Sequence, residues 1–247
     1  MAARNSSHGT VSRDQWATRI AALDESPSAP RPRKAPITVE RIVEVALRLV
    51  EVDGFEALTM RRIATTLQTG PASLYAHVRN KADLDDLLIG ELCARVALPT
   101  PDPDHWQTQV IDVYGQLRDQ FLRYHGISHA ALAASPNNLD TFRINEGVFA
   151  ILLAGGVPAQ PAAWAIDAAY LYVSAYSLEV SLRQKPGEDV DGRTLDRDEA
   201  IERLQMLPAR RFPNMTSHAR ELTAGEGHER FDFTLGLLFQ GITPTTS

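Results

Sequence analysis

A run of small residues followed by long hydrogen-bond donors begins at Gly70. The small residues are Gly70, Pro71, Ala72 and Ser73, and the long donors are Tyr75, His77 and Lys81. A helix that enters the major groove of DNA, about 12 Å wide, must expose a small, polar surface near its start. Free backbone N–H groups there favour a phosphate, and longer donors behind them can reach the DNA backbone or a base edge. The residue types and their order therefore indicate a helix over 71–77 that contacts DNA.

Other helices must position this one. A first helix is expected over 38–53 with Thr38 as its N-cap, and a short helix over 59–67 with Thr59 as its N-cap. A glycine-containing turn then leads to Pro71, which suits the first position of a helix. Two short helices joined by such a turn, with a longer helix packed across them, form a helix-turn-helix.

Two strings carry this pattern. They are Leu58-Thr59-Met60-Arg61-Arg62-Ile63-Ala64 and Ser73-Leu74-Tyr75-Ala76-His77-Val78-Arg79-Asn80-Lys81-Ala82-Asp83-Leu84. They resemble the DNA-binding domain of TetR-family transcriptional regulators, over about residues 37–97 without a gap. The resemblance implies DNA-facing positions at Thr59, Arg61, Gly70, Pro71, Ala72, Ser73, Tyr75, His77 and Lys81. Taken singly, Tyr75 could instead be a core aromatic and His77 a cation at a helix end. Ala76 stands where the tetracycline repressor has a large aromatic, so no operator sequence is implied.

Charge is unevenly distributed along the chain. Its 247 residues include 25 Lys+Arg and 31 Asp+Glu, a formal net charge of −6. Nine Lys/Arg and five Asp/Glu lie between Arg31 and Lys81, a net charge of +4, which leaves −10 for the rest. A basic segment on an acidic body suits a DNA-binding end, although ordinary surface variation accounts for the difference about equally well.

Composition excludes several classes of protein. Cys93 is the single cysteine, which excludes an intramolecular disulfide framework and a Cys-based zinc cluster. No run approaches the roughly 18 apolar residues that span a bilayer, and the start lacks the apolar stretch of a signal peptide. We expect a cytoplasmic protein with no membrane partner, no metal and no cofactor. His125 and His129 are four residues apart, as metal ligands can be, but polar surface histidines are the better interpretation.

Helical spacing continues through the second half and predicts an all-α fold. Helices are expected at about 104–125, 138–154, 160–183, 197–207 and 227–241. The expected parts are a flexible arm over 1–36, a three-helix DNA-binding domain over 37–82, and a larger effector-binding and dimerisation domain over 83–247. Residues 83–97 form the connecting helix. The arm contains Arg31-Pro32-Arg33-Lys34, which could follow phosphates or a minor groove, although a solvated linker is the simpler interpretation.

The second half carries a further set of familiar residues: Trp106-Gln107, Leu122-Arg123-Tyr124, Gly156, Ala165-Ile166, Ala168 and Leu178-Glu179. They are similar to the regulatory domain of the tetracycline repressor. This similarity implies a ligand site lined by Ala97, Val113, Leu117, Ala131, Pro136, Asn145, Phe149, Ile166, Tyr170 and Glu179. Ala131 replaces the histidine that holds the drug–magnesium chelate in that repressor, and one carboxylate cannot build a magnesium site. We therefore expect an apolar, uncharged effector other than tetracycline, with Asn145 as the polar anchor.

Two helices of the second half carry more apolar residues than a thin bundle can cover. The residues expected at a partner surface are Trp164, Val173, Phe231, Leu235 and Leu238. In the family, these helices of two subunits form a four-helix interface, and a palindromic operator requires the same symmetry. The alternative is that these residues close the core of one chain.

The resemblance implies a homodimeric, ligand-responsive regulator of transcription. The simplest form is a repressor that leaves its double-stranded DNA operator when a small-molecule effector moves the connecting helix. An activator and a regulator that ignores ligands stay open. So does an all-α carrier or enzyme without a DNA function, although no nucleophile–base pair or phosphate loop is apparent and no catalytic residue is expected.

Overall fold

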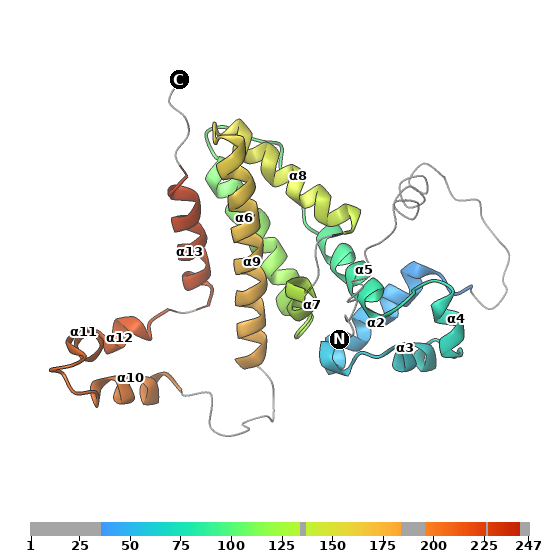
Figure 1. Ribbon diagram of the computed structural model, residues 1–247, viewed down its shortest axis with the longest axis horizontal. Coiled ribbons are helices and arrows are strands. Elements are labelled where there is room, and N and C mark those ends of the chain that lie inside the picture. Colours follow the sequence, from blue (N-terminus) through green and yellow to red (C-terminus); the bar gives the residue numbers. More distant parts are fainter. Residues whose placement is uncertain (1–35, 134–136, 184–195, 226, 243–247) are drawn as a thin grey trace, which may run out of the picture.

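A computed structural model describes residues 36–133, 137–183, 196–225 and 227–242. Every regular element in these ranges is a helix (Figure 1), which confirms the predicted all-α fold. The N-terminal part contains α2 (Val39–Asp53), the 3-10 helix η1 (Phe55–Ala57), α3 (Met60–Thr66) and α4 (Pro71–Tyr75). The C-terminal part contains α5 (Lys81–Ala94), α6 (Trp106–Arg123), α7 (Ser128–Ala133), α8 (Leu139–Ala154), α9 (Ala159–Arg183), α10 (Arg197–Gln205), α11 (Pro213–Ser217), α12 (Ala219–Leu222) and α13 (Glu229–Gln240). The expected arm lies outside the described residues, apart from residue 36.

The first helices begin where the sequence supplies a capping side chain. Thr38, Thr59 and Asn80 each accept a hydrogen bond from the backbone N–H three residues later, at 3.3, 3.2 and 2.9 Å. Each bond satisfies one of the N–H groups that a helix start leaves unpaired. Helix α2 ends at Gly54, whose φ of 81° favours glycine. These observations confirm the caps predicted at Thr38 and Thr59 and the predicted end of the first helix.

One continuous apolar core runs through both parts of the molecule. Helix α2 packs against α3 and α5, and α3 packs against α4. The buried side chains that join these helices include Ile42, Ala46, Ile63, Leu74, Leu84 and Leu88. Because α5 contributes to this core and also packs against α6, α7 and α8, it belongs to both parts.

Helices α6 to α9 pack together, and α13 covers one side of them. Tyr114 of α6 stacks on Phe239 of α13, with ring centroids 6.2 Å apart. Tyr172 and Tyr176 of α9 lie 5.6 and 5.0 Å from the ring of Phe231. Helices α10 to α12 pack on one another and lie apart from the other helices in Figure 1. None of the described helices combines the length and the apolar character that crossing a lipid bilayer requires.

Three residues expected at a partner surface are instead buried within the chain. Val173, Phe231 and Leu235 are each 0% exposed, so a second chain cannot reach them, and that expectation is wrong. Leu238 is half-buried. The reason is that α13 packs on α9 and α6 within one chain, and this contact takes up the apolar face that contains these residues.

The opposite faces of α9 and α13 are apolar and exposed. Trp164, Leu171 and Leu182 of α9 are 68%, 50% and 58% exposed, and Phe233 and Leu237 of α13 are 66% and 55% exposed. On α9 these residues follow helical spacing, so they form one stripe. We name these five residues the outer apolar stripe.

Candidate DNA and effector sites

Helix α4 is anchored by one buried side chain and shows the others to solvent. Leu74 is 0% exposed, whereas Tyr75 is 51% exposed. Pro71, Ala72 and Ser73 are also exposed. The residue before the helix, Gly70, has no side chain that could cap it. The helix therefore presents a small surface at its start and a long donor at its end.

Two predicted DNA contacts lie beyond α4, which ends two residues before His77. His77 is exposed in the turn that follows. Lys81 begins α5, where its Nζ pairs with Asp85 and lies 3.9 Å from the centroid of the Phe55 ring. In this structure Lys81 thus joins α5 to η1, and it must leave Asp85 to reach a phosphate.

Two neighbouring arginines at the start of α3 are placed differently. Arg62 turns back onto the domain, where it bonds Asp53 at 2.5 Å and the carbonyl oxygen of Ala57 at 3.3 Å. Arg61 is exposed. The hydroxyl of Thr59 caps the helix. Of the two arginines, the predicted DNA contact, Arg61, is the one that faces solvent.

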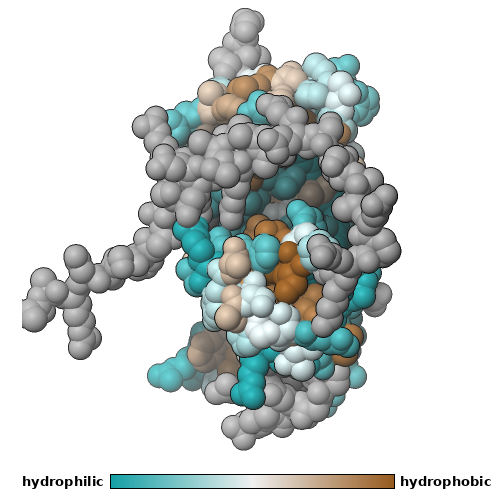
Figure 2. Space-filling view, turned by 90° about the vertical axis from the view of Figure 1, so that its right-hand side faces the viewer, coloured by the Kyte–Doolittle hydropathy of each residue, from teal (hydrophilic) through white to brown (hydrophobic). Residues whose placement is uncertain are grey.

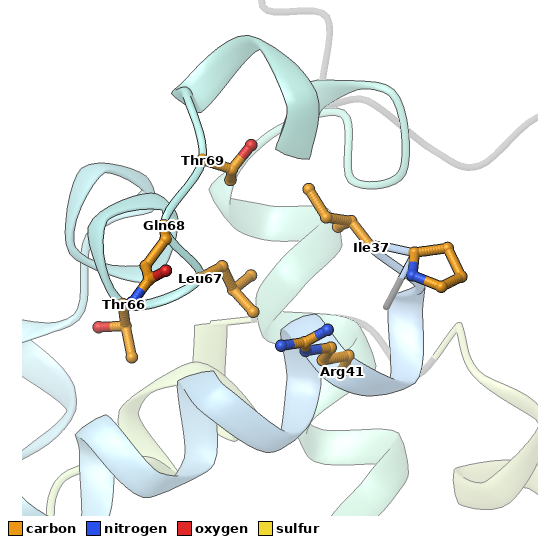
Figure 3. Close-up of a pocket in the computed structure, with 7 residues that line it drawn as sticks. Ile37, Arg41, Thr66, Leu67, Gln68 and Thr69 are labelled. Atoms are coloured by element: carbon orange, nitrogen blue, oxygen red, sulfur yellow. The ribbon is translucent and has the colours of Figure 1, made fainter. Parts of the chain in front are cut away.

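A hollow of about 420 Å³ lies between the start of α2 and the turn between α3 and α4 (Figure 3). It is lined by Pro36, Ile37, Arg41, Thr66, Leu67, Gln68 and Thr69. Figure 2, which faces the end of the molecule that carries α4, shows apolar residues near its middle, next to residues of intermediate and hydrophilic character. Pro36, the first described residue, thus lies beside the turn that leads into α4.

Most of the predicted effector residues lie on four helices that pack together, α6 to α9. Val113, Leu117 and Ala131 are buried, and Asn145, Phe149, Ile166 and Tyr170 are half-buried. Ala97 is exposed just after α5. Pro136 lies outside the described residues. The grouping of these helices places the candidate effector site inside the C-terminal part.

Glu179 is committed to two arginines. Its carboxylate lies 2.6 Å from Arg183 and 2.5 Å from Arg230, and the second contact ties α9 to α13. A carboxylate neutralised in this way is a poor ligand for a magnesium–drug chelate. In this structure the carboxylate of Glu179 therefore serves to join α9 to α13.

Sequence reasoning missed several interior polar groups on α7 and α9. Ser128, Ser174 and Ser177 are 0% exposed, and their hydroxyls have no hydrogen-bond partner among the described residues. Burial, with Cys93 and Asp86 nearby, raises the pKa of Tyr170, so its phenol stays a neutral donor. The interior is thus more polar than an apolar lining with one anchor. Serine on one face of α9, at 174, 177 and 181, was the signal in the sequence.

The two spaced histidines differ in their surroundings. His129 is exposed, but His125 is half-buried, and its Nε2 has no partner among the described residues. The carbonyl oxygen of His125 accepts a hydrogen bond from the backbone of Phe55 at 2.9 Å, a contact between the two parts of the molecule. Within the described ranges, no three His, Cys, Asp or Glu side chains gather as metal ligands would.

Both parts of the chain match known domain families. Residues 42–85 match the family of bacterial regulatory proteins called tetR, and residues 98–246 match the tetracyclin repressor-like C-terminal domain. An HTH-type transcriptional regulator of Saccharopolyspora erythraea is 35% identical over 128 residues, 50% of this chain and 52% of that protein. The HTH-type transcriptional repressor DrrR1 of Streptomyces coeruleorubidus is 40% identical over 76 residues, 30% of this chain and 27% of that protein. The chain thus matches about half or less of the length of these two relatives.

ActR of Streptomyces coelicolor is a structural relative of this chain. The crystal structure of ActR in complex with actinorhodin has a TM-score of 0.75 and 34% identity, and the match covers 84% of this chain and 95% of ActR. For the complex of ActR with (S)-DNPA the TM-score is 0.74 and the identity 33%, with coverage of 84% and 97%. Because these matches cover 84% of this chain, the similarity extends through both the DNA-binding and the C-terminal parts.

Proposed function

Because this chain belongs to the TetR family of bacterial regulatory proteins, we propose that it is a homodimeric repressor that an effector releases from DNA. Members of this family are transcriptional regulators and not enzymes. In the proposed complex, two copies of α4 lie in successive major grooves of a palindromic operator, about one helical turn apart. The proposed site of action is the cytoplasm.

The observation that carries the DNA-binding proposal is the exposure pattern of α4. A residue buried in the domain core, Leu74, fixes the helix, while the residues on either side of it, Ser73 and Tyr75, remain exposed. A small surface at the start of a helix allows a close approach to base edges. The helix is therefore rigidly held and open on the side that DNA would meet.

The outer apolar stripe supports the homodimer. An exposed set of large apolar side chains on α9 and α13 marks a protein interface more often than an ordinary surface. A two-fold axis brings the same stripe of a second copy against it, which buries both at once. The same axis gives the pair of α4 helices the symmetry of a palindrome.

Actinorhodin, the molecule bound in the similar structure of ActR, is the first effector to test. We propose a largely apolar molecule that also carries hydrogen-bonding groups, because Ser174, Ser177 and the neutral phenol of Tyr170 lie among apolar side chains. Polar groups placed in this way orient a ligand in an apolar site.

Helix α5 provides the route between the two sites, since it packs against α2 and also against α6, α7 and α8. An effector that favours a different tilt of α5 changes the distance between the two copies of α4. A coupling free energy of about 1–3 kcal/mol is enough for such a response.

The proposal is tested by fluorescence anisotropy of a labelled duplex from the region upstream of its own gene. The full chain should raise the anisotropy, and added actinorhodin should lower it again. A duplex that is bound but not released would remove actinorhodin as the effector. A duplex that is never bound would contradict the repressor itself.

A further inference from the structure

The start of helix α8 packs against the connecting helix α5 (Figure 1). The buried side chains Leu84 and Leu88 of α5 belong to the core shared with α2, while the last turn of α5 lies in the C-terminal part. If a displacement of α8 also displaces α5, the displacement is therefore transmitted to the DNA-contacting helices.

Asn138 makes the first attachment. It is the N-cap of α8, and its Oδ1 accepts a hydrogen bond from the N–H of Thr141 at 2.7 Å. Its Nδ2 donates to the backbone oxygen and to Oδ1 of Asp86 on α5, at 3.2 and 3.3 Å. Both Asn138 and Asp86 are 8% exposed. Because one amide group caps α8 and also bonds α5, it cannot rotate away from α5 without uncapping α8.

Gly90 allows this close approach of the two helices. A Cβ atom at Gly90 would lie 3.0 Å from Cγ and 3.1 Å from Oδ1 of Asn138. Any larger residue would push the start of α8 away from α5. The sequence thus provides both the amide group and the space that it occupies.

Arg143 makes the second attachment, at the C-terminal end of α5. Its Nη2 donates to the carbonyl oxygens of Cys93, Val96 and Ala94 at 2.6, 2.9 and 3.3 Å. The last carbonyls of a helix lack partners within it and carry the negative end of the helix dipole. The guanidinium of α8 therefore acts as the cap of α5.

Candidate effector contacts lie on the same face of α8. Thr141, Asn145 and Phe149 follow Asn138 at three, seven and eleven residues, which places them along one side of the helix. The hydroxyl of Thr141 also lies 3.5 Å from Sγ of Cys93 on α5. One side of α8 thus runs from the attachment on α5 to the candidate effector site.

We propose that Asn138 and Arg143 are positioning residues that transmit a displacement of α8 to α5. This inference rests on the proposed function and adds the side chains that carry the coupling. An effector against Asn145 and Phe149 displaces α8, and the two attachments move α5 with it. Since coupling between two binding sites is reciprocal, DNA bound at α4 must also alter α8. DNA can therefore serve as the probe in place of an unidentified effector.

Hydrogen–deuterium exchange of the full chain, with and without the upstream duplex, tests the proposal. Asn138→Ser keeps a capping oxygen but removes the amide donor to Asp86, and Arg143→Met removes the donors to α5. The control, Arg203→Met, breaks a comparable arginine contact with Glu199 on α10. In the wild type and the control, DNA should slow exchange in α3 and α4 and change exchange in α8 about fivefold, the low end of allosteric coupling.

In the two variants, α3 and α4 should still be protected by DNA, while the response of α8 should fall below about twofold. Arg143→Lys, which keeps the charge with fewer donors, should give an intermediate response. For each variant, exchange with the duplex is compared with exchange without it. A loss of stability affects both measurements, so it does not by itself produce this result. An α8 response that persists in both variants, or is missing in the wild type, overturns the proposal and leaves the proposed function intact. No protection of α4 in the wild type contradicts the proposed function and this inference together.

Discussion

Leu74 and Tyr75 are neighbours on α4 with opposite surroundings. Leu74 is 0% exposed and holds the helix on the core, whereas Tyr75 is 51% exposed. A residue that serves the fold can therefore be separated from a residue that serves binding by comparing stability with DNA affinity. Replacing either residue removes a large side chain, so the two variants control for each other.

Tyr75→Ala should weaken binding of the upstream duplex by about 1–3 kcal/mol, about five- to 150-fold, if its side chain contacts DNA. The midpoint of thermal unfolding should stay unchanged because the side chain is exposed. Leu74→Ala should instead lower the free energy of unfolding by about 2–5 kcal/mol, measured by denaturant titration. Val52→Ala, at a side chain that is 80% exposed on α2, is the control that should change neither quantity. Unaltered DNA binding by Tyr75→Ala would remove this residue from the interface.

Cys93 should be inert in the folded protein. Burial raises the pKa of its thiol to about 11, so the nucleophilic thiolate is scarce at pH 8. The side chain is also 0% exposed. A colorimetric thiol reagent at pH 8 should react in seconds in denaturant and far more slowly without it. Equal reaction rates with and without denaturant would show that the thiol of Cys93 is not buried.

At the scale of helices, the sequence predicts what is local. Thr38, Thr59 and Gly54 mark helix ends because a cap acts on its own backbone, and the structure has these ends where they were expected. The second short helix is an exception, since it stops at Tyr75 and leaves His77 in a turn.

What the sequence could not predict is which face of a helix its neighbours cover. Helix α9 is apolar on more than one side, so Val173 and Leu171 were equally suited to a partner surface. Helix α13 packs on α9. Val173 is buried in the packed structure, whereas Leu171 remains 50% exposed. The attachments of Asn138 and Arg143 to α5 are missed for the same reason, since they join residues about fifty positions apart.

A charge placed in the outer apolar stripe should separate the dimer. Phe233→Glu and Leu237→Glu put a carboxylate where two apolar faces would meet, which costs several kcal/mol if the surface is buried. Sedimentation should then show one chain where the wild type shows two, with unchanged helix content. Val52→Glu, on α2, should remain dimeric. A wild type that sediments as a single chain would contradict the homodimer.

At the scale of the whole molecule, the net charge of −6 is divided unevenly between two parts of the sequence. The segment from Arg31 to Lys81 carries +4 and the remainder −10. DNA repels an acidic segment and attracts a basic one, so the segment that contains α4 is the one we expect to dock. The net charge of the whole chain argues against a nucleic-acid partner. The net charge of the segment from Arg31 to Lys81 agrees with such a partner.

Magnesium–tetracycline should not bind the C-terminal part. Glu179 is neutralised by Arg183 and Arg230, and Ala131 offers no ligand for a metal. We expect no shift of the unfolding midpoint with this chelate, whereas a true effector at 100 times its Kd should stabilise the fold by about 2.7 kcal/mol. A clear shift with magnesium–tetracycline would show that the site is built differently.

The most direct test of the proposed homodimeric regulator is a titration of the full chain against two duplexes of equal length. One holds a palindromic sequence from the upstream region, and the other has the same composition in scrambled order. We expect saturation at two chains for each palindrome, with an affinity at least about a thousandfold higher than for the scrambled duplex at physiological salt. Equal affinity for both duplexes, or saturation by a single chain, would contradict it.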